Sequence, residues 1–160
     1  DVGQIYFNTS KAYFDLSNPD NAIKNANIAK QYFETMSFKN EYQKRMIAEN
    51  YLILNDTSNA ISLLDSVNEE KRDIWWKYTY SKVLSLSQEN PKALELISEC
   101  INEATYSKDT FYRERANIRI RAGECPCEDL NIAYKYCEDE KFRNMILEEI
   151  KQNECQNAPL

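Results

Sequence analysis

The sequence predicts an all-α protein, a right-handed α-α superhelix of four helical hairpins closed by a C-terminal capping helix. Two observations lead to this fold class. Glycine (2) and proline (4) are scarce among the 160 residues, which is typical of long helices with few sharp corners. In addition, a triplet of small or aliphatic residues at spacings of four and three recurs along the chain. The triplets are Ala22, Ala26, Ala29; Ala60, Leu64, Val67; Ala93, Ile97, Cys100; and Pro126, Leu130, Ala133.

Each triplet marks the second helix of a hairpin, because residues at these spacings share one face of a helix. We expect the hairpins at about residues 2–36, 41–67, 71–105 and 108–138, and the capping helix at about 140–151. Together they form a single domain over residues 1–160, which is a common length for one domain.

The first two hairpins are bounded by recognisable start and stop signals. The segment Ser17-Asn18-Pro19 ends the first helix and starts the second, since proline suits the first helical position. The segment Asn55-Asp56-Thr57 breaks the third helix and supplies an N-cap for the fourth.

The last two hairpins carry similar signals. Asn90 and Pro91 provide the cap and first position of the sixth helix, and Ser107 is expected to cap the seventh. Gly123 ends the seventh helix. The last helix places Phe142, Met145, Ile146 and Ile150 on one stripe, as a capping helix requires.

A small residue also recurs in the first helix of each hairpin, at Ser10, Ala48, Ser81 and Ala116. With the triplets, this pattern over residues 3–138 resembles the tetratricopeptide repeat (TPR), which has a period of about 34 residues. Leu84 and Arg119 stand where the family usually has Tyr, and Pro126 replaces the first Ala of its triplet. The resemblance implies a non-catalytic scaffold that binds proteins or peptides.

In the resembled fold, the first helices line a concave groove. Its face corresponds here to Phe7, Lys11, Phe14, Tyr42, Arg45, Glu49, Trp75, Tyr78, Lys82, Arg113, Asn117 and Arg121. The resemblance implies peptide binding by Phe14, Arg45, Trp75, Tyr78, Lys82, Arg113, Asn117 and Arg121. Cations and aromatics outnumber acids there, which favours a partner with an acidic or C-terminal segment. Ordinary charge alternation on exposed helices is the alternative interpretation.

Arg113 and Asn117 resemble the carboxylate clamp of chaperone-binding members of this family. Phe7 stands where the clamp needs a cation, so we do not expect an adaptor for chaperone tails.

The composition argues against several other functions. A net charge of −6 disfavours nucleic acid binding, which needs a basic face. The chain has no histidine, which is the commonest general base and a common metal ligand. We therefore expect no enzyme, no cofactor and no metal site. No apolar run is long enough for direct membrane insertion of this segment.

The five cysteines are Cys100, Cys125, Cys127, Cys137 and Cys155. A zinc site formed by the last four, a redox-active pair and a structural disulfide are the possible roles. If the eighth and last helices form an antiparallel hairpin that turns near Asp139, Cys127 comes beside Cys155. We therefore expect Cys155 to pair with Cys125 or Cys127, with Cys127 favoured, and Cys100 and Cys137 to be buried thiols.

The tail also resembles the C-terminal hairpin of many Bacteroidetes repeat proteins, in which one Cys precedes Glu-Asp and another follows the last helix. Together with a disulfide, this implies an extracytoplasmic bacterial protein, periplasmic or on the cell surface, such as a lipoprotein. A cytoplasmic location is the alternative. The chain is either a complete scaffold or a sensor or assembly module of a larger regulator, lipoprotein or secretion apparatus.

Overall fold

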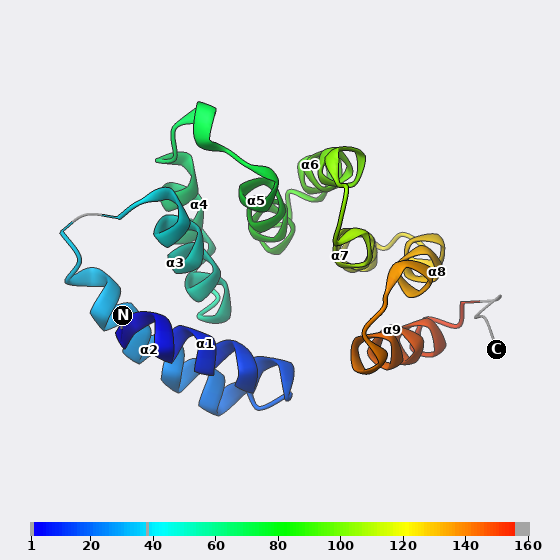
Figure 1. Ribbon diagram of the computed structural model, residues 1–160, viewed down its shortest axis with the longest axis horizontal. Helices are drawn as coiled ribbons and strands as arrows, with labels where there is room; N and C mark the ends of the chain where they lie inside the picture. Colours follow the sequence, from blue (N-terminus) through cyan, green and yellow to red (C-terminus); the bar gives the residue numbers. More distant parts are fainter. Residues whose placement is uncertain (1, 38, 156–160) are drawn as a thin grey trace. The chain divides into compact units, whose positions relative to one another are not determined.

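The computed structural model describes residues 2–37 and 39–155, and every regular element within these ranges is helical (Figure 1). The α-helices are α1 (Val2–Asp15), α2 (Pro19–Glu34), α3 (Glu41–Ile53), α4 (Thr57–Asp65), α5 (Ile74–Leu86), α6 (Asn90–Glu103), α7 (Lys108–Ala122), α8 (Cys127–Tyr136) and α9 (Glu140–Gln152). A short 3-10 turn, η1 (Glu69–Lys71), precedes α5, so that helix starts slightly later than expected. The predicted all-α class is confirmed.

The chain divides into two compact units, Asp1–Thr79 and Tyr80–Leu160, and the division falls within α5. We call them the N-terminal unit and the C-terminal unit and describe each by itself. In the N-terminal unit, α1 packs against α2, α3 against α4, and α2 against α3. In the C-terminal unit, α7 packs against α6 and α8, and α8 packs against α9.

The first helix of each hairpin ends in one recurring turn. The residue after its last turn is left-handed, at Ser17, Asn55, Gln88 and Gly123. The next N–H then donates to a carbonyl in the last helical turn, as from Asn18 to Tyr13 and from Glu124 to Arg119 (2.9 and 2.8 Å).

Helix α9 ends in the same way, with Glu154 left-handed and the Cys155 N–H on the Ile150 carbonyl (3.1 Å). Helices α2, α4, α6 and α8 instead end in right-handed or extended residues. The capping helix is thus built like the first helix of a further hairpin.

Alanine forms the contact surface between α1 and α2. Ala22, Ala26 and Ala29 are fully buried, and the Ser10 hydroxyl donates to the Ala22 carbonyl at 2.7 Å. Because alanine adds little bulk, the two helices approach closely enough for this side chain to reach a backbone group of its partner helix. The triplet inferred from the sequence therefore lies on the buried face of α2.

The core of the N-terminal unit corrects one sequence interpretation. Phe7 is buried and belongs to a cluster of Phe7, Ala29, Phe33, Met46 and Ile47. Its assignment to the binding groove was wrong, because α1 is apolar over more than one face and spacing alone could not choose among them. Phe14, two turns further along the same side of α1, is exposed.

Two hydrogen bonds fix the way in which consecutive hairpins dock in the N-terminal unit. The Asn50 side chain of α3 donates to the Ala26 carbonyl of α2 at 3.0 Å. The Trp76 indole N–H of α5 donates to the Leu64 carbonyl of α4 at 3.1 Å. In both cases a first helix rests on the second helix of the preceding hairpin.

One buried cluster of the C-terminal unit joins α7, α8 and α9. It consists of Ala116, Leu130, Ala133, Cys137, Ile146, Ile150 and Cys155. Ile146 and Ile150, two members of the stripe expected on the last helix, are fully buried, whereas Met145 is exposed. Helix α9 therefore caps the unit by burying its apolar side against α7 and α8.

The helix starts match the expected caps in part. Asp56 accepts a hydrogen bond from Asn59 at the start of α4 and is the N-cap expected within Asn55-Asp56-Thr57, and Asn18 accepts one from Asn21 at the start of α2. Ser107 precedes α7 but its side chain makes no capping bond, because the residue is left-handed (φ 55°). The expected cap at Asn90 is also wrong, because this residue is already within α6 and its side chain accepts from Ser85.

Within the described residues, no helix is long and apolar enough to cross a membrane. The same part of the chain holds no group of three or more Cys, Asp or Glu side chains arranged to bind a metal ion.

Candidate functional site

The N-terminal unit presents one continuous face of first helices. The Gln4 amide donates to the Tyr42 hydroxyl (3.3 Å), and the Lys11 ammonium lies 3.0 Å from the Glu49 carboxylate, which connects α1 to α3. The Thr79 hydroxyl of α5 donates to the other oxygen of Glu49 at 3.2 Å. Consecutive first helices therefore lie beside one another. Lys11, Tyr42 and Glu49, which were predicted to face the groove, take part in the contacts between neighbouring first helices.

Four of the predicted binding residues lie in this unit. Phe14 has a side chain 60% exposed. The Arg45 guanidinium stacks over the exposed Tyr42 ring at 5.5 Å, and Trp75 and Tyr78 form an edge-to-face pair at 5.8 Å. Arg45 and Tyr42 border a cavity of about 80 Å³ whose other walls are Glu41, Val67, Lys71, Asp73 and Trp76.

The other four lie in the C-terminal unit, where two of the cations have carboxylate partners. Arg113 forms a bidentate ion pair with Glu149 and stacks over Phe142 at 4.8 Å, both on α9. Arg121 donates to the Ser85 hydroxyl (3.2 Å) and lies 3.6 Å from the buried Glu114 carboxylate. Lys82 and Asn117 are half-buried. Carboxylates of the chain itself therefore pair with Arg113 and Arg121, where the sequence interpretation expected the acidic group of a partner.

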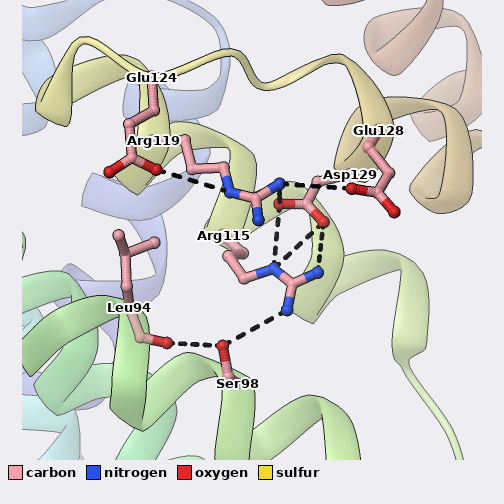
Figure 2. Close-up of polar contacts among 7 residues, drawn as sticks. All are labelled: Leu94, Ser98, Arg115, Arg119, Glu124, Glu128 and Asp129. Carbon is pink, nitrogen blue, oxygen red and sulfur yellow. Dashed lines mark hydrogen bonds and ion pairs between the residues drawn. The ribbon is translucent and has the colours of Figure 1, made fainter. Parts of the chain in front are cut away.

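A buried carboxylate that the sequence interpretation missed organises α6, α7 and α8 (Figure 2). Asp129, fully buried near the start of α8, accepts from the Arg115 Nε with both oxygens (3.1 and 3.0 Å). Arg119, one turn along α7, binds it at 2.9 Å, and Arg115 also reaches Ser98 of α6 at 3.4 Å. Figure 2 shows both guanidinium groups converging on the one carboxylate.

This cluster is a structural element. The hydrogen bond to Asp129 raises the pKa of Arg115, so this guanidinium stays charged. Arg115 and Arg119 are one turn apart, and an acid follows in the first turn of the next helix. This pattern of two arginines and a following acid is the feature of the sequence from which the contact could have been predicted.

The C-terminal unit also contains the disulfide. Cys127 at the start of α8 is bonded to Cys155, which follows α9, so the favoured one of the two expected pairings is the one observed. Cys125 is an exposed free thiol, and Cys100 and Cys137 are buried thiols outside the disulfide. Burial, followed by the charge of Asp109, raises the pKa of Cys137, so this thiol is a poor nucleophile.

A second cleft, of about 290 Å³, lies between α2, α3 and α4 of the N-terminal unit. Its walls are Phe33, Glu34, Lys39, Ile47, Tyr51, Asn59, Ser62, Leu63 and Ser66. Burial, with smaller effects from Glu34 and Asp56, raises the pKa of Tyr51, which therefore stays protonated at neutral pH. The walls combine apolar, polar and charged side chains, the charged ones being Glu34 and Lys39.

Comparison with known proteins defines the fold. No protein-family model and no curated protein sequence matches the chain. One similar solved structure is a crystal structure of nearly identical TPR-like repeats from Podospora anserina, in a protein named after the kinesin light chain. It has 12% sequence identity and a TM-score of 0.50, and the match covers 94% of this chain and 93% of that one. At this identity the likeness shows the fold alone, a TPR-like array of helical hairpins.

Proposed function

We propose that this protein is a non-catalytic scaffold that binds a partner protein or peptide on the first-helix face of the N-terminal unit. The observation that carries the proposal is the group of Tyr42, Arg45, Trp75 and Tyr78 on the consecutive first helices α3 and α5. Aromatic residues and arginine provide most of the binding energy in protein interfaces. TPR-like arrays offer such faces to partners without forming a chemical site.

The distribution of charge favours a binding surface in this unit. Arg45 stacks on a ring and lies beside a small cavity, whereas Arg113 is neutralised by Glu149. We propose a partner segment with an acidic side chain or a C-terminal carboxylate near Arg45 and an apolar side chain near Trp75. In the C-terminal unit, Lys82, Asn117 and Arg121 then have a secondary role, and Arg113 serves to hold α9.

The disulfide supports a further proposal about location. A covalent Cys127–Cys155 bond is stable in oxidising compartments and rare in the cytosol. We propose that the protein works outside the cytoplasm, where such a bond persists.

The binding face is tested by photo-crosslinking in the cells from which the protein comes. A photoreactive amino acid replaces Trp75, and in a matched control it replaces Gln31, which is exposed on the second helix α2. We expect a protein adduct at position 75 that is absent at position 31. The adduct identifies the partner by mass spectrometry.

Purified partner then provides the quantitative test. We expect the double variant Tyr42→Ala/Arg45→Ala to bind about tenfold more weakly or worse, because it removes an anchor and a cation together. Tyr106→Ala is the control, since this tyrosine is exposed in the C-terminal unit. Unchanged affinity in the double variant would show that the face is not the binding site.

A further inference from the structure

The small cavity beside Arg45 has apolar inner walls and polar outer walls. Val67 and Trp76 are buried, whereas Tyr42, Lys71 and Asp73 are exposed. The cavity has a volume of about 80 Å³. That is about half of the roughly 150 Å³ of an apolar cavity that holds benzene. A short aliphatic group therefore fits into it, and an aromatic ring does not.

Polar contacts hold the inner walls of the cavity in place. The Trp76 indole N–H donates to the Leu64 carbonyl at 3.1 Å, and the Arg72 guanidinium lies over the Trp76 ring at 4.6 Å. The Nε of Arg72 also donates to the Val67 carbonyl at 3.2 Å. Because these walls are fixed before a partner arrives, little conformational freedom is lost when the cavity is filled.

The charges around the cavity leave one cation without an anion. Glu41 lies 3.5 Å from the Lys71 ammonium, and the Asp73 carboxylate accepts a hydrogen bond from the backbone N–H of Trp76 at 2.7 Å. Arg45 stacks on the Tyr42 ring but forms no ion pair with any residue that the structure describes. A guanidinium in this state can donate two parallel hydrogen bonds to a carboxylate of another molecule.

We propose that this cavity is the specificity pocket of the binding face and takes one valine, isoleucine or leucine side chain of the partner, next to an aspartate or glutamate that pairs with Arg45. The inference rests on the proposed function, since it assigns the partner's chemistry at the same face. The buried walls Val67 and Trp76 favour the aliphatic group, because removing apolar surface from water is favourable. The volume of the cavity excludes phenylalanine, tyrosine and tryptophan from this position.

A random peptide library displayed on phage, selected on the full chain, tests the pocket. We expect the enriched peptides to share a valine, isoleucine or leucine beside an aspartate or glutamate. In a synthetic copy of such a peptide, alanine at the aliphatic position should lower the affinity about tenfold, since each buried methylene contributes about fourfold. Phenylalanine at that position should lower the affinity at least as much, because the ring does not fit.

Variants of the protein test the walls and the charge separately. Val67→Phe fills the cavity and should weaken binding of the enriched peptides about tenfold, whereas Val67→Ala enlarges it and should shift the selection towards methionine and phenylalanine. Arg45→Gln should lose the preference for an acidic neighbour and the weakening of binding by salt. Arg143→Gln is the matched control and should bind unchanged, because Arg143 also stacks on a tyrosine ring, that of Tyr134 at 4.6 Å, but in the C-terminal unit. Circular dichroism establishes that each variant is folded.

The outcomes separate the pocket from the binding face as a whole. A selection that enriches no pair of aliphatic and acidic residues overturns the inference, and so does wild-type affinity in Val67→Phe together with an unshifted selection by Val67→Ala. If Tyr42→Ala/Arg45→Ala weakens binding and Val67→Phe does not, the face remains the binding site and the pocket alone is refuted. The proposed function itself fails if the photoreactive residue at position 75 captures no partner.

Discussion

The two units build the same kind of helical hairpin with different chemistry. In the N-terminal unit, α1 and α2 meet through alanine, and neutral hydrogen bonds such as Ser10 to Ala22 join the helices. In the C-terminal unit, the buried carboxylate of Asp129 binds two arginines and so joins three helices. A disulfide also links Cys127 at the start of α8 to Cys155, which follows α9. The comparison shows that the repeat pattern specifies the helices, whereas the contacts between them can be apolar, neutral or charged.

The difference also separates stability from recognition. The arginines of α7 form ion pairs with carboxylates of the same unit, and the last helix packs on a buried apolar cluster. The N-terminal unit exposes Phe14, Tyr42 and apolar residues of α1 such as Ile5. We therefore expect the C-terminal unit to be the more stable part, and the proposed binding face lies in the N-terminal unit.

The largest effect is expected at Asp129. Asp129→Asn keeps the side-chain volume but leaves Arg115 and Arg119 without their anion. Removing one partner of a buried ion pair costs about 3–5 kcal/mol, and we expect the lower part of that range because both arginines keep some solvent contact. Urea unfolding monitored by circular dichroism measures it.

Glu148→Gln is the matched control for this charge change. Glu148 pairs with Lys151 on the surface of α9, and both side chains are largely exposed. Such pairs contribute about 0–1 kcal/mol. Equal losses in the two variants would contradict the structural role assigned to Asp129.

The disulfide should have an effect of similar size. Cys127→Ser/Cys155→Ser opens a loop whose ends are 28 residues apart, and the chain-entropy model gives about 3–4 kcal/mol for a loop of this size. Guanidinium unfolding of the variant, compared with the oxidised protein, measures the change. Cys125→Ser is the control and should have no effect, since that thiol is free and exposed. Destabilisation by the control alone would mean that Cys125 forms the bond.

A smaller effect is expected where the N-terminal unit uses a neutral contact. Trp76→Phe removes the hydrogen bond to Leu64 and some of the indole's packing volume. The loss should be about 1–2 kcal/mol, because neutral hydrogen bonds contribute less than charged ones. Thermal unfolding tests it. A loss larger than that of Asp129→Asn would reverse the proposed ranking of the two units.

The smallest changes in stability are expected at two helix ends that share the same left-handed turn. Gly123→Ala should cost about 1 kcal/mol, because its φ of 75° strains any side chain, although no atom lies within 4 Å of an added Cβ. At the corresponding turn of the N-terminal unit, Asn55→Gly should be neutral or slightly stabilising (φ 56°). Thermal midpoints of the two variants measure both. Destabilisation by Asn55→Gly would show that contacts of the Asn55 side chain stabilise the fold by more than the strain of its left-handed backbone costs.

Much of the fold could be predicted because it depends on local signals. The triplets placed Ala22, Ala60 and Ala93 on buried faces, and the turn after the eighth helix favoured Cys127 over Cys125 as the partner of Cys155, which is the observed pairing. These inferences needed only helical periodicity and the position of one turn. They did not depend on how far one helix is rotated against another.

The candidate site could be predicted less well because it depends on that rotation. The partner of Arg113 is Glu149, and the sequence does not reveal which face of α9 turns towards α7. Phe7 was misplaced because an apolar residue on an apolar helix suits the core and a binding groove equally. Asp129 was overlooked because an acid near a helix start is also expected on the surface, where it favours the helix dipole.

Hydrogen exchange in the oxidised and the reduced protein tests the contrast between the units most directly. When the disulfide is intact, we predict slower exchange of the backbone amides in α7, α8 and α9 than in α1 and α2. Reduction should then speed exchange mainly in α8 and α9, which the Cys127–Cys155 bond connects, and leave α1 and α2 nearly unchanged. Equal protection of the two units, or a uniform loss along the whole chain on reduction, would contradict it.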